Sequence, residues 1–422
     1  MAEKKINQVL FFTGSYPFSS ASEDTFIDPE LPFLLSTCTS VVIIPKSSIG
    51  NRKKLPQSII VENTLAELFT HKKIRRFNIK TLILALTSPY FFREIIKKPT
   101  ITLQIQIIGR IIYDLGSALQ TKRWLIKYIK NNNVDLKRTI FYTYWLDEVS
   151  FGISLAKKKY PMMQVISRAH GVDIYEEQNF ASFIPFRPEI FSSIDKVFPD
   201  SEKGRKYLST HFPEYRARFF TSRLGVEGQN DISTPSNDGV FRIVSCSYLI
   251  PLKRIDLLIK GLQVLGNLQT THQFEWTHIG DGPLRNDLEQ MAEDLLPPNV
   301  NHRFLGYVPE GGVISYYQNN PVDVFVNVSF SEGTPVSIME AQSCGIVVIA
   351  TDAGGNSEIV SMENGLLLSL NPDPLEIADA ISVLLCDDKM LKSKKIKSYE
   401  NWKNYYNSRK NFQDFYNNLK HM

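Results

Sequence analysis

The chain has 422 residues, of which 43% are hydrophobic and 22% charged, and its formal net charge is +4. This length predicts two or three domains with substantial cores, and this composition excludes a wholly disordered chain. The four cysteines are widely spaced without a C-x-x-C pair, which argues against a disulfide framework or a zinc cluster. No apolar run reaches the roughly 18 residues of a membrane span, and the run in the opening segment MAEKKINQVLFFTG is too short for a secretion signal. We therefore expect a cytoplasmic protein.

Short apolar runs alternate with longer helical patterns along most of the chain. The runs predict strands at 8–14, 41–45, 139–145, 164–171, 196–201, 241–249, 275–282, 302–308, 322–329 and 347–354. Several runs are apolar throughout, as in parallel strands that are covered on both faces. This alternation predicts an α/β fold with doubly wound sheets, which bind ligands at the carboxyl ends of their strands.

One polar stretch divides the chain into two α/β halves. Residues 225–239 are rich in Gly, Ser, Asn, Asp and Pro, a composition typical of linkers. We expect an N-terminal domain at 1–225, a linker at 226–239 and a second domain at 240–390. The last stretch, 391–422, is polar and aromatic, and we expect it to be helical and to pack back toward the first domain.

Two positions in the first half follow predicted strands. Gly14 comes directly after the first strand, where a backbone without a Cβ could approach a ligand closely. His170 stands at the end of a later strand, in SRAHGVDIYEE. Its imidazole could donate to a sugar hydroxyl or a phosphate, or transfer a proton, although a lone histidine is more often structural.

The segment 71–130 is strongly basic, with 13 Lys or Arg against the two acids Glu94 and Asp114. Aliphatic and aromatic residues lie between these charges at roughly helical spacing. One interpretation is a face that rests on an anionic membrane surface near a lipid-linked acceptor. The alternative is solvated lysines on helices that pack in the core. A nucleic-acid partner is not expected, because the segment is too apolar between its charges.

Two turns in the second half follow predicted strands. Lys253 and Arg254 open an apolar helix in CSYLIPLKRIDLLIKGL, where two cations are well placed to bind a diphosphate, although such a pair is often only solvated. Gly282 lies in HIGDGPLR, which resembles half of a dinucleotide-binding fingerprint, but position 285 is Arg rather than Gly. A plain turn is the alternative there.

The densest signal is VNVSFSEGTPVSIMEAQSCG, a strand, a turn and a helix. The amides of Gly333 and Thr334 are expected at the N-terminus of that helix, where backbone donors and the helix dipole favour an anion such as phosphate. Glu340, further along the helix, could accept hydrogen bonds from a ribose diol. Glu332 stands three residues after Ser329, so a structural capping box is the alternative.

The sequence lacks the motifs of several enzyme classes. It has no D-x-D pair, the usual metal-chelating motif of metal-dependent sugar transfer, and none of G-x-S-x-G, G-x-x-x-x-G-K-[ST] or H-E-x-x-H. We therefore expect no metal, and we do not expect a serine hydrolase, a P-loop NTPase or a zinc protease.

Taken together, several segments resemble retaining glycosyltransferases of family four, in particular those of bacterial cell-surface polysaccharides. They are SEGTPVSIME, LIPLKRIDLLI, GDGPLR, FLGYV, ATDAGGNSEIV and ENGLLL in the second half, and SRAHGVDIYEE, YTYWL and SRLGV in the first. The resemblance implies the GT-B fold, two doubly wound Rossmann-like domains that face each other across a cleft.

The resemblance also implies roles for individual residues of the second half. Glu340 would hold the ribose of a nucleotide sugar, and Lys253 would neutralise the diphosphate leaving group. Glu332, with the amides of Gly333 and Thr334, would face the donor sugar and phosphates.

The first half would supply His170, which the resemblance places against the donor sugar. Many members carry an arginine where this chain has Tyr248, and Arg254 is a candidate to replace that charge. Many also carry a double glycine in the first loop, where this chain has only Gly14.

The function implied is a retaining, metal-independent glycosyltransferase. It would move a hexosyl or related group from a UDP- or GDP-sugar to a glycan or lipid-linked oligosaccharide, in capsule, O-antigen or exopolysaccharide synthesis, without a bound cofactor. Two alternatives stay open. One is an enzyme of the same fold but another reaction, such as a nucleotide-sugar epimerase or a glycosyl phosphorylase, and the other is a catalytically inactive sugar-nucleotide-binding partner.

Overall fold

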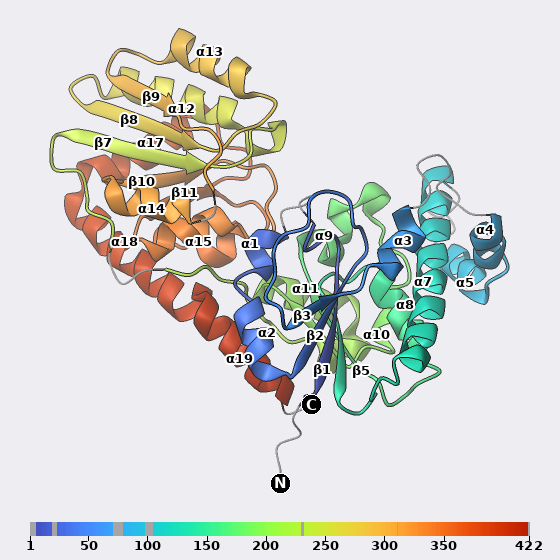
Figure 1. Ribbon diagram of the computed structural model, residues 1–422. Coiled ribbons are helices and arrows are strands. Elements are labelled where there is room, and N and C mark those ends of the chain that lie inside the picture. Colours follow the sequence, from blue (N-terminus) through green and yellow to red (C-terminus); the bar gives the residue numbers. More distant parts are fainter. Residues whose placement is uncertain are drawn as a thin grey trace. The chain divides into compact units, whose positions relative to one another are not determined.

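The computed structural model describes residues 6–18, 23–70, 79–97, 104–228, 232–309 and 311–420. The chain divides into two compact units, Met1–Ser222 with Phe412–Met422 and Arg223–Asn411. Each unit contains a six-stranded sheet with helices on both faces (Figure 1). The predicted α/β class and the two doubly wound domains are therefore confirmed.

The sheet of the first unit is parallel throughout, in the order β3-β2-β1-β4-β5-β6. Its strands are β1 (Gln8–Thr13), β2 (Ser40–Pro45), β3 (Ile59–Val61), β4 (Thr139–Thr143), β5 (Gln164–Ala169) and β6 (Lys196–Pro199). Side chains alternate between the two faces of a strand, so an apolar run supplies both cores at once. In β1, for example, Leu10 and Phe12 join one core and Val9 and Phe11 join the other.

The helices of the first unit cover the two faces of this sheet. The larger core lies beneath α7 (Ile105–Asn131), α8 (Glu148–Lys157), α10 (Arg187–Phe191) and α11 (Glu202–His211), with α3 (Thr64–Thr70), α4 (Ile79–Leu86), α5 (Pro89–Lys97) and α9 (Gly171–Ile174) around it. The other core lies beneath α1 (Asp24–Ile27), α2 (Leu31–Thr37) and α19 (Ser408–Lys420). The C-terminal helix thus completes a core that begins with the first strand.

The second unit repeats the same architecture. Its parallel sheet has the order β12-β11-β10-β7-β8-β9 and consists of β7 (Val240–Cys246), β8 (Gln273–Ile279), β9 (Val300–Phe304), β10 (Val324–Asn327), β11 (Val347–Thr351) and β12 (Gly365–Leu368). One face packs against α12 (Ile255–Leu268), α13 (Arg285–Leu295) and α17 (Pro374–Cys386). The other packs against α14 (Gly312–Asn319), α15 (Val336–Ser343) and α16 (Asn356–Ile359), and α18 (Asp388–Asn401) follows.

In both sheets the chain builds one half outward from the centre and then returns to build the other. The change of direction falls between β1 and β4 in the first unit and between β7 and β10 in the second. Such a switch point opens a crevice at the carboxyl ends of the two central strands, where α/β proteins bind their ligands. The topology therefore locates one candidate site in each unit.

All ten predicted strands are present, but most end earlier than predicted. The polar residues after each apolar run, such as those after β4, β5 and β10, belong to loops. The short strands β3 and β12, each at an edge of its sheet, were missed. Part of the expected linker, 229–231, lies outside the described residues. Of the rest, Ser233 and Ser236 donate backbone hydrogen bonds to Cys344 O and Asp323, within the second unit.

Within the described part of the chain, none of the helices combines the length and the apolar character needed to cross a membrane.

Candidate functional site

An ion pair lies at the switch point of the second unit. Lys253 follows β7 and Glu332 follows β10, and Lys253 Nζ lies 2.7 Å from Glu332 Oε1. Asn327 Nδ2, at the end of β10, donates to the same carboxylate oxygen at 3.2 Å. The side chains of the pair are mostly buried, with 20% of Lys253 and 9% of Glu332 exposed. The site therefore holds an ammonium group in place at the edge of the sheet.

The loop that carries Glu332 packs against two glycines. Gly354 has φ +54°, and a Cβ there would lie 1.9 Å from Glu332 O. A Cβ at Gly355 would lie 2.0 Å from Gly333 O, to which the Gly355 amide donates. Side chains at either position would push this loop away from Lys253, which explains the double glycine of ATDAGGNSEIV.

Helix α15 begins next to this loop. It starts at Val336 with Pro335 as its N-cap, one residue later than predicted. Glu332 lies outside the helix and pairs with Lys253, so the capping-box alternative is wrong. A Cβ built at Gly333 would meet no atom within 4 Å, so this position borders open space in front of the helix.

Glu340 lies on α15, close to the end of β7. Burial and the nearby charge of Glu340 raise the pKa of the Cys246 thiol, while the charge of Lys253 opposes that rise. Glu340, Lys253 and Cys246 are therefore neighbours at the same edge of the sheet. The five positions predicted for the donor's ribose and phosphates (Lys253, Glu332, Gly333, Thr334 and Glu340) come together in this unit.

Arg254 connects two loops next to the site through hydrogen bonds of its side chain. It adopts a left-handed backbone conformation (φ +49°), and its guanidinium donates to Val328 O at 2.7 Å, Ser329 O at 3.0 Å and Leu370 O at 2.9 Å. The side chain thus holds the loops after β10 and β12 together. A contact of Arg254 with a donor phosphate stays a prediction.

Gly282 is explained by packing. A Cβ there would lie 2.6 Å from both Leu249 N and Leu249 O, so the turn after β8 needs glycine to approach the loop after β7. Tyr248, which takes the place of the family's arginine, is 60% exposed. A direct donor contact of Gly282 stays a prediction.

In the first unit, His170 follows β5 as the N-cap of α9. Its Nε2 lies 3.1 Å from Tyr144 O and its Nδ1 lies 3.4 Å from Asp200 Oδ2, so both ring nitrogens face acceptors. Burial disfavours the charged ring, but the hydrogen bond and the charge of Asp200 outweigh it and raise the pKa of His170. These contacts hold the imidazole as a hydrogen-bond donor to groups of the chain. A contact of His170 with the sugar of a nucleotide sugar stays a prediction.

Gly14 follows β1, but its amide has a partner within the chain. The Gly14 N–H donates to Glu23 Oε1 at 2.8 Å, and a Cβ at Gly14 would lie 2.7 Å from that same oxygen. The glycine therefore makes room for Glu23. The close approach at Gly14 is to a carboxylate of the chain itself, and a contact of Gly14 with a donor stays a prediction.

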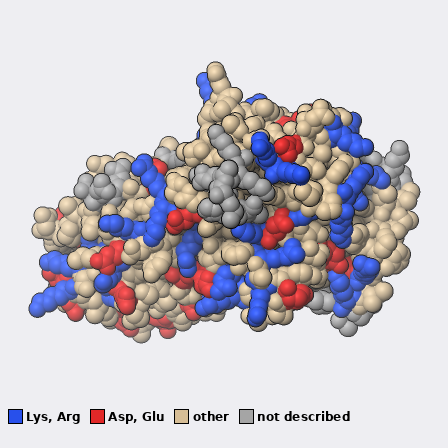
Figure 2. Space-filling model, turned by 90° about the horizontal axis from the view of Figure 1, so that it is seen from below, with Lys and Arg blue, Asp and Glu red and all other residues tan. Residues whose placement is uncertain are grey.

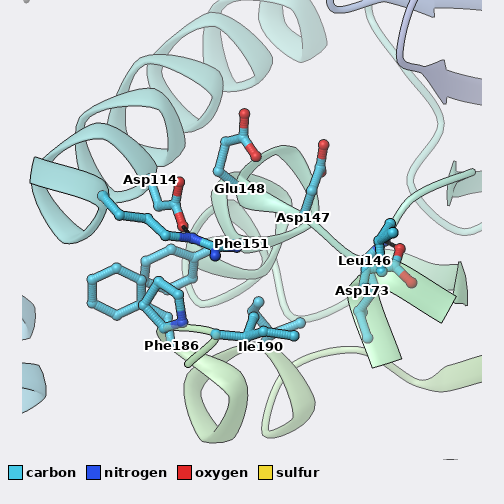
Figure 3. A pocket seen from close by; sticks show the side chains of 12 residues that line it. Asp114, Leu146, Asp147, Glu148, Phe151, Asp173, Phe186 and Ile190 are labelled. Carbon is cyan, nitrogen blue, oxygen red and sulfur yellow. Dashed lines mark hydrogen bonds and ion pairs between the residues drawn. The ribbon is translucent and has the colours of Figure 1, made fainter. Parts of the chain in front are cut away.

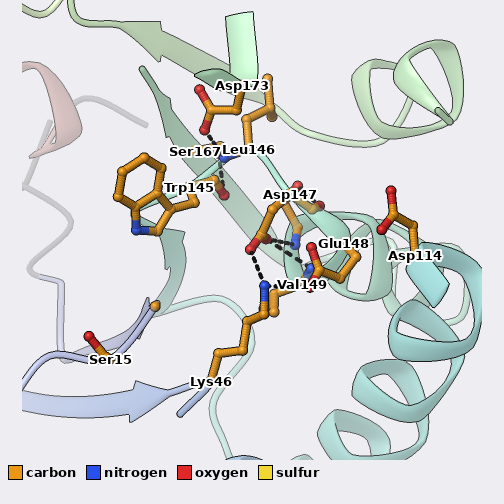
Figure 4. A network of polar contacts seen from close by, with 12 residues as sticks. Ser15, Lys46, Asp114, Trp145, Leu146, Asp147, Glu148, Val149, Ser167 and Asp173 are labelled. Atoms are coloured by element: carbon orange, nitrogen blue, oxygen red, sulfur yellow. Dashed lines mark hydrogen bonds and ion pairs between the residues drawn. The ribbon is translucent and has the colours of Figure 1, made fainter. Parts of the chain in front are cut away.

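A small cavity of about 80 Å³ lies near the carboxyl ends of β4 and β5. Its lining includes Asp114, Asp147, Glu148 and Phe186 (Figure 3). Lys46, which follows β2, pairs with Asp147 at 3.3 Å and with Glu148 (Figure 4).

Asp114 and Asp147 have raised pKa values. Burial and the charge of Glu148 raise the pKa of Asp114 to about 7 and that of Asp147 to about 6. Burial opposes the charge of Lys46, but Asp147 and Glu148 raise its pKa. Arg110 also lines the cavity, with its Nε 3.6 Å from Asp114 Oδ2, so Arg110 and Lys46 offset the burial of these carboxylates only in part.

Sequence reasoning missed several residues that support the two sites. They are Asn327, Gly354 and Gly355 in the second unit, and Glu23, Lys46, Asp114, Asp147, Glu148 and Asp200 in the first. The double glycine carried a readable signal. The others are common polar residues, and only the folded chain brings them together.

Comparison with known proteins finds a similarity that is confined to part of the chain. Residues 228–407 match the family model described as "Glycosyl transferases group 1". A phosphatidylinositol N-acetylglucosaminyltransferase subunit of Arabidopsis thaliana is 33% identical over 153 residues, which cover 36% of this chain and 33% of the relative. A UDP-Gal:alpha-D-GlcNAc-diphosphoundecaprenol alpha-1,3-galactosyltransferase of Escherichia coli is 34% identical over 116 residues, 27% of this chain and 28% of the relative. The chain thus matches about a third of the length of these curated relatives.

The whole fold has counterparts among solved structures. The lipopolysaccharide outer core galactosyltransferase WaaB, in its apo form, superposes with a TM-score of 0.65 at 15% sequence identity, covering 96% of this chain and 98% of that one. At this identity the likeness shows the fold alone, the GT-B arrangement of two Rossmann-like domains. Residues 228–407, less than half of the chain, are thus similar to the group 1 glycosyltransferases.

Proposed function

We propose that this protein is a retaining, metal-independent glycosyltransferase. It transfers a hexosyl or related group from a UDP- or GDP-sugar to a glycan or lipid-linked acceptor in bacterial cell-surface polysaccharide synthesis. The observation that carries the proposal is the Lys253–Glu332 pair at the switch point of the second unit, in front of α15. The name of the Escherichia coli relative supports a UDP-sugar donor and a lipid diphosphate acceptor.

The geometry supports the departure of a nucleoside diphosphate. Negative charge grows on the diphosphate as its bond to the sugar breaks. Lys253 and the amides in front of α15 are fixed donors for that charge, and such donors are worth about 3–4 kcal/mol each in other enzymes. These donors would stabilise the negative charge on the diphosphate in place of a metal ion. Glu340 would bind the ribose. The resemblance to family four supports retention, and no carboxylate is assigned as a nucleophile.

The donor site can be tested by ligand-induced thermal stabilisation. The full chain is heated with UDP-, GDP-, ADP- and CMP-sugars, beside Lys253→Ala and Glu340→Ala. One nucleotide class should raise the Tm, since a ligand at a hundred times its Kd adds about 2.7 kcal/mol. Both variants should lose most of that shift.

Lys260→Ala is the matched control, because Lys260 lies on α12 with 48% of its side chain exposed. It should keep the full shift. A flat response of the wild-type protein to every nucleotide sugar would contradict the donor site.

Turnover separates the transferase from its alternatives. With the stabilising donor and a lipid-linked glycan acceptor, the transferase releases nucleoside diphosphate and lengthens the acceptor. An epimerase changes the donor without an acceptor, a phosphorylase consumes phosphate, and an inactive partner binds donor without change. Mass spectrometry of donor and acceptor distinguishes these four outcomes.

We also propose that α4, α5 and the start of α7 rest on an anionic membrane. Among their exposed apolar side chains, Phe92 is 54%, Ile96 75% and Ile105 83% exposed. The parts 71–78 and 98–103 of the predicted basic segment lie outside the described residues. Figure 2 shows basic and acidic side chains mixed on one face of the molecule, so charge alone is not expected to hold the protein on a membrane. We expect the exposed apolar side chains to insert into the membrane and to add to the charge attraction.

Liposome flotation tests this contact. The protein should float with phosphatidylglycerol vesicles more than with phosphatidylcholine vesicles, and Phe92→Asp with Ile96→Asp should abolish flotation. Met362→Asp, at a residue 69% exposed in the second unit, is the control and should float as the wild type does. Equal recovery of the wild type with both vesicles would refute the membrane contact.

A further inference from the structure

One buried carboxylate in the first unit gathers an unusual number of donors. Glu23 is 3% exposed, and it accepts from the backbone amides of Gly14 at 2.8 Å, Ser15 at 2.6 Å and Tyr16 at 2.7 Å. Ser15 Oγ donates to it at 3.2 Å, and the indole Nε1 of Trp145 donates to it as well. Hydrogen bonds to a charged group are among the stronger ones in proteins, so this carboxylate fixes the loop after β1 firmly.

The Trp145 contact joins two parts of the switch point. Glu23 holds the loop after β1, and Trp145 follows β4, so their hydrogen bond links the ends of the two central strands. Trp145 projects toward the loop that carries Ser15 (Figure 4). The backbone amides alone would be enough for Glu23 to fix this loop. The hydrogen bond from the Trp145 indole is an additional contact.

The indole in turn packs on His170. The ring centroids of Trp145 and His170 are 4.8 Å apart, and those of Tyr144 and His170 are 4.9 Å apart. His170 is only 8% exposed. Its ring nitrogens face Tyr144 O and Asp200, so the indole is the contact by which the loop after β1 reaches it.

The glycine at position 14 reflects the same arrangement. A Cβ there would approach Glu23 Oε1 to 2.7 Å and Trp145 Nε1 to 3.3 Å. Any larger residue would therefore displace either the carboxylate or the indole. The first loop of this chain is shaped around its own carboxylate.

We infer that Glu23 is a positioning residue that acts through Trp145 on His170. The inference rests on the proposed function, because only there is His170 a group that meets the donor sugar. Glu23 itself touches no reacting atom. It keeps the indole against the imidazole, and the imidazole keeps its partners Tyr144 O and Asp200.

Chemical labelling of the full chain tests this without any sugar donor. Diethyl pyrocarbonate modifies accessible histidines, and mass spectrometry follows each histidine separately. In Glu23→Ala, His170 should react about tenfold faster or more, the factor that matches loss of one hydrogen bond to a charged group. Sodium formate should restore protection by filling the empty carboxylate position, whereas sodium chloride at the same ionic strength should not.

Internal references separate positioning from general loosening. His278 is fully buried in the second unit and should stay unreactive throughout. Asp24→Ala, which removes the neighbouring carboxylate, is the matched control and should leave His170 protected. Trp145→Phe keeps an aromatic ring but lacks the indole donor, and it should expose His170 while the amides of Gly14 and Ser15 keep Glu23.

Three results would overturn the inference. They are an unchanged rate at His170 in a folded Glu23→Ala variant, faster labelling that formate does not reverse, and equal acceleration at His278. If Glu23→Ala does not fold, Trp145→Phe decides, and an unchanged His170 rate there overturns the inference equally. Since no donor is used, failure here leaves the thermal-stabilisation test of the proposed function independent.

Discussion

At the scale of single residues, the first unit has several carboxylates around a small cavity, where burial disfavours their charged form. Asp114, Asp147 and Glu148 lie around one small cavity, where Arg110 pairs with Asp114 and the half-buried Lys46 pairs with Asp147 and Glu148. Burying a carboxylate costs free energy unless a charge or hydrogen bonds compensate it. The high pKa of Asp114 is the sign of incomplete compensation.

Asp114→Asn should therefore flatten the dependence of stability on pH. The pKa of Asp114 is raised from 3.8 to about 7. Between these values the folded chain binds more protons than the unfolded chain, so the free energy of unfolding falls as the pH rises from 4 to 7. The variant should lose this fall and gain up to about 4 kcal/mol over the wild type at pH 8, relative to pH 4.

Urea unfolding at each pH measures this effect. Asp135→Asn, at an exposed position, is the control and should follow the wild-type curve. A parallel fall in wild type and Asp114→Asn would show that other groups cause it.

Some residues of the two sites could be predicted from the sequence, and others could not. Lys253, Glu332 and Glu340 were predicted from strand–turn–helix patterns and from the resemblance to a family, and the structure brings them together. Glu23 and Asp200 were not predicted. Their partners Trp145 and His170 lie 122 and 30 residues away, and no local pattern encodes such a contact.

At the scale of elements, α19 is unusual because it completes a core far from it in sequence. Phe415 and Tyr416 pack in the core beneath β1, and Tyr416 donates to Glu30 at 2.7 Å. The guanidinium of Arg168 lies 4.4 Å from the centre of the Phe415 ring and pairs with Glu30 at 3.3 Å. The packing of α19 and the buried Arg168–Glu30 pair therefore stabilise each other.

Phe415→Ala should destabilise the first unit by about 3–5 kcal/mol, the usual cost of emptying a buried phenylalanine site. The cation–π contact with Arg168 is lost as well, which favours the upper end. Denaturant unfolding followed by circular dichroism measures it, and Gln413→Ala on the exposed side of α19 is the control. A loss below 1 kcal/mol would mean that α19 is not part of the core in solution.

Elements also show where sequence patterns reach their limit. Central strands were predicted because burial on both faces makes them apolar throughout, whereas β3 and β12 are edge strands of three and four residues. A pattern of that length is too short to stand out. Predicted strands ran too long because an extended polar loop and a strand end look alike in sequence.

At the scale of the whole molecule, both sheets follow one plan. Each places its first strand beside its fourth, so each has a single switch point with its functional candidates at the carboxyl ends. Most of the donor-binding candidates lie within 223–411, whereas Gly14 and His170 lie in the other unit. Binding of nucleotide and positioning of His170 are thus assigned to separate units.

A chain limited to residues 223–411 should consequently fold and bind the same nucleotide as the full protein. Isothermal titration calorimetry should give Kd values within about tenfold, a difference of about 1.4 kcal/mol. The complementary piece 1–222 should be unstable, because it lacks the aromatic residues of α19. Loss of nucleotide binding by folded 223–411 would show that the first unit contributes to the donor site.

The position of α19 also sets an order of events during synthesis. The ribosome makes β1 first and the helix that covers its core last, with the whole second unit in between. Until residues 412–420 emerge, Val9 and Phe11 face a core without its final helix. The second unit has all of its own elements earlier, so the half of the protein that is translated later is the first that can finish folding.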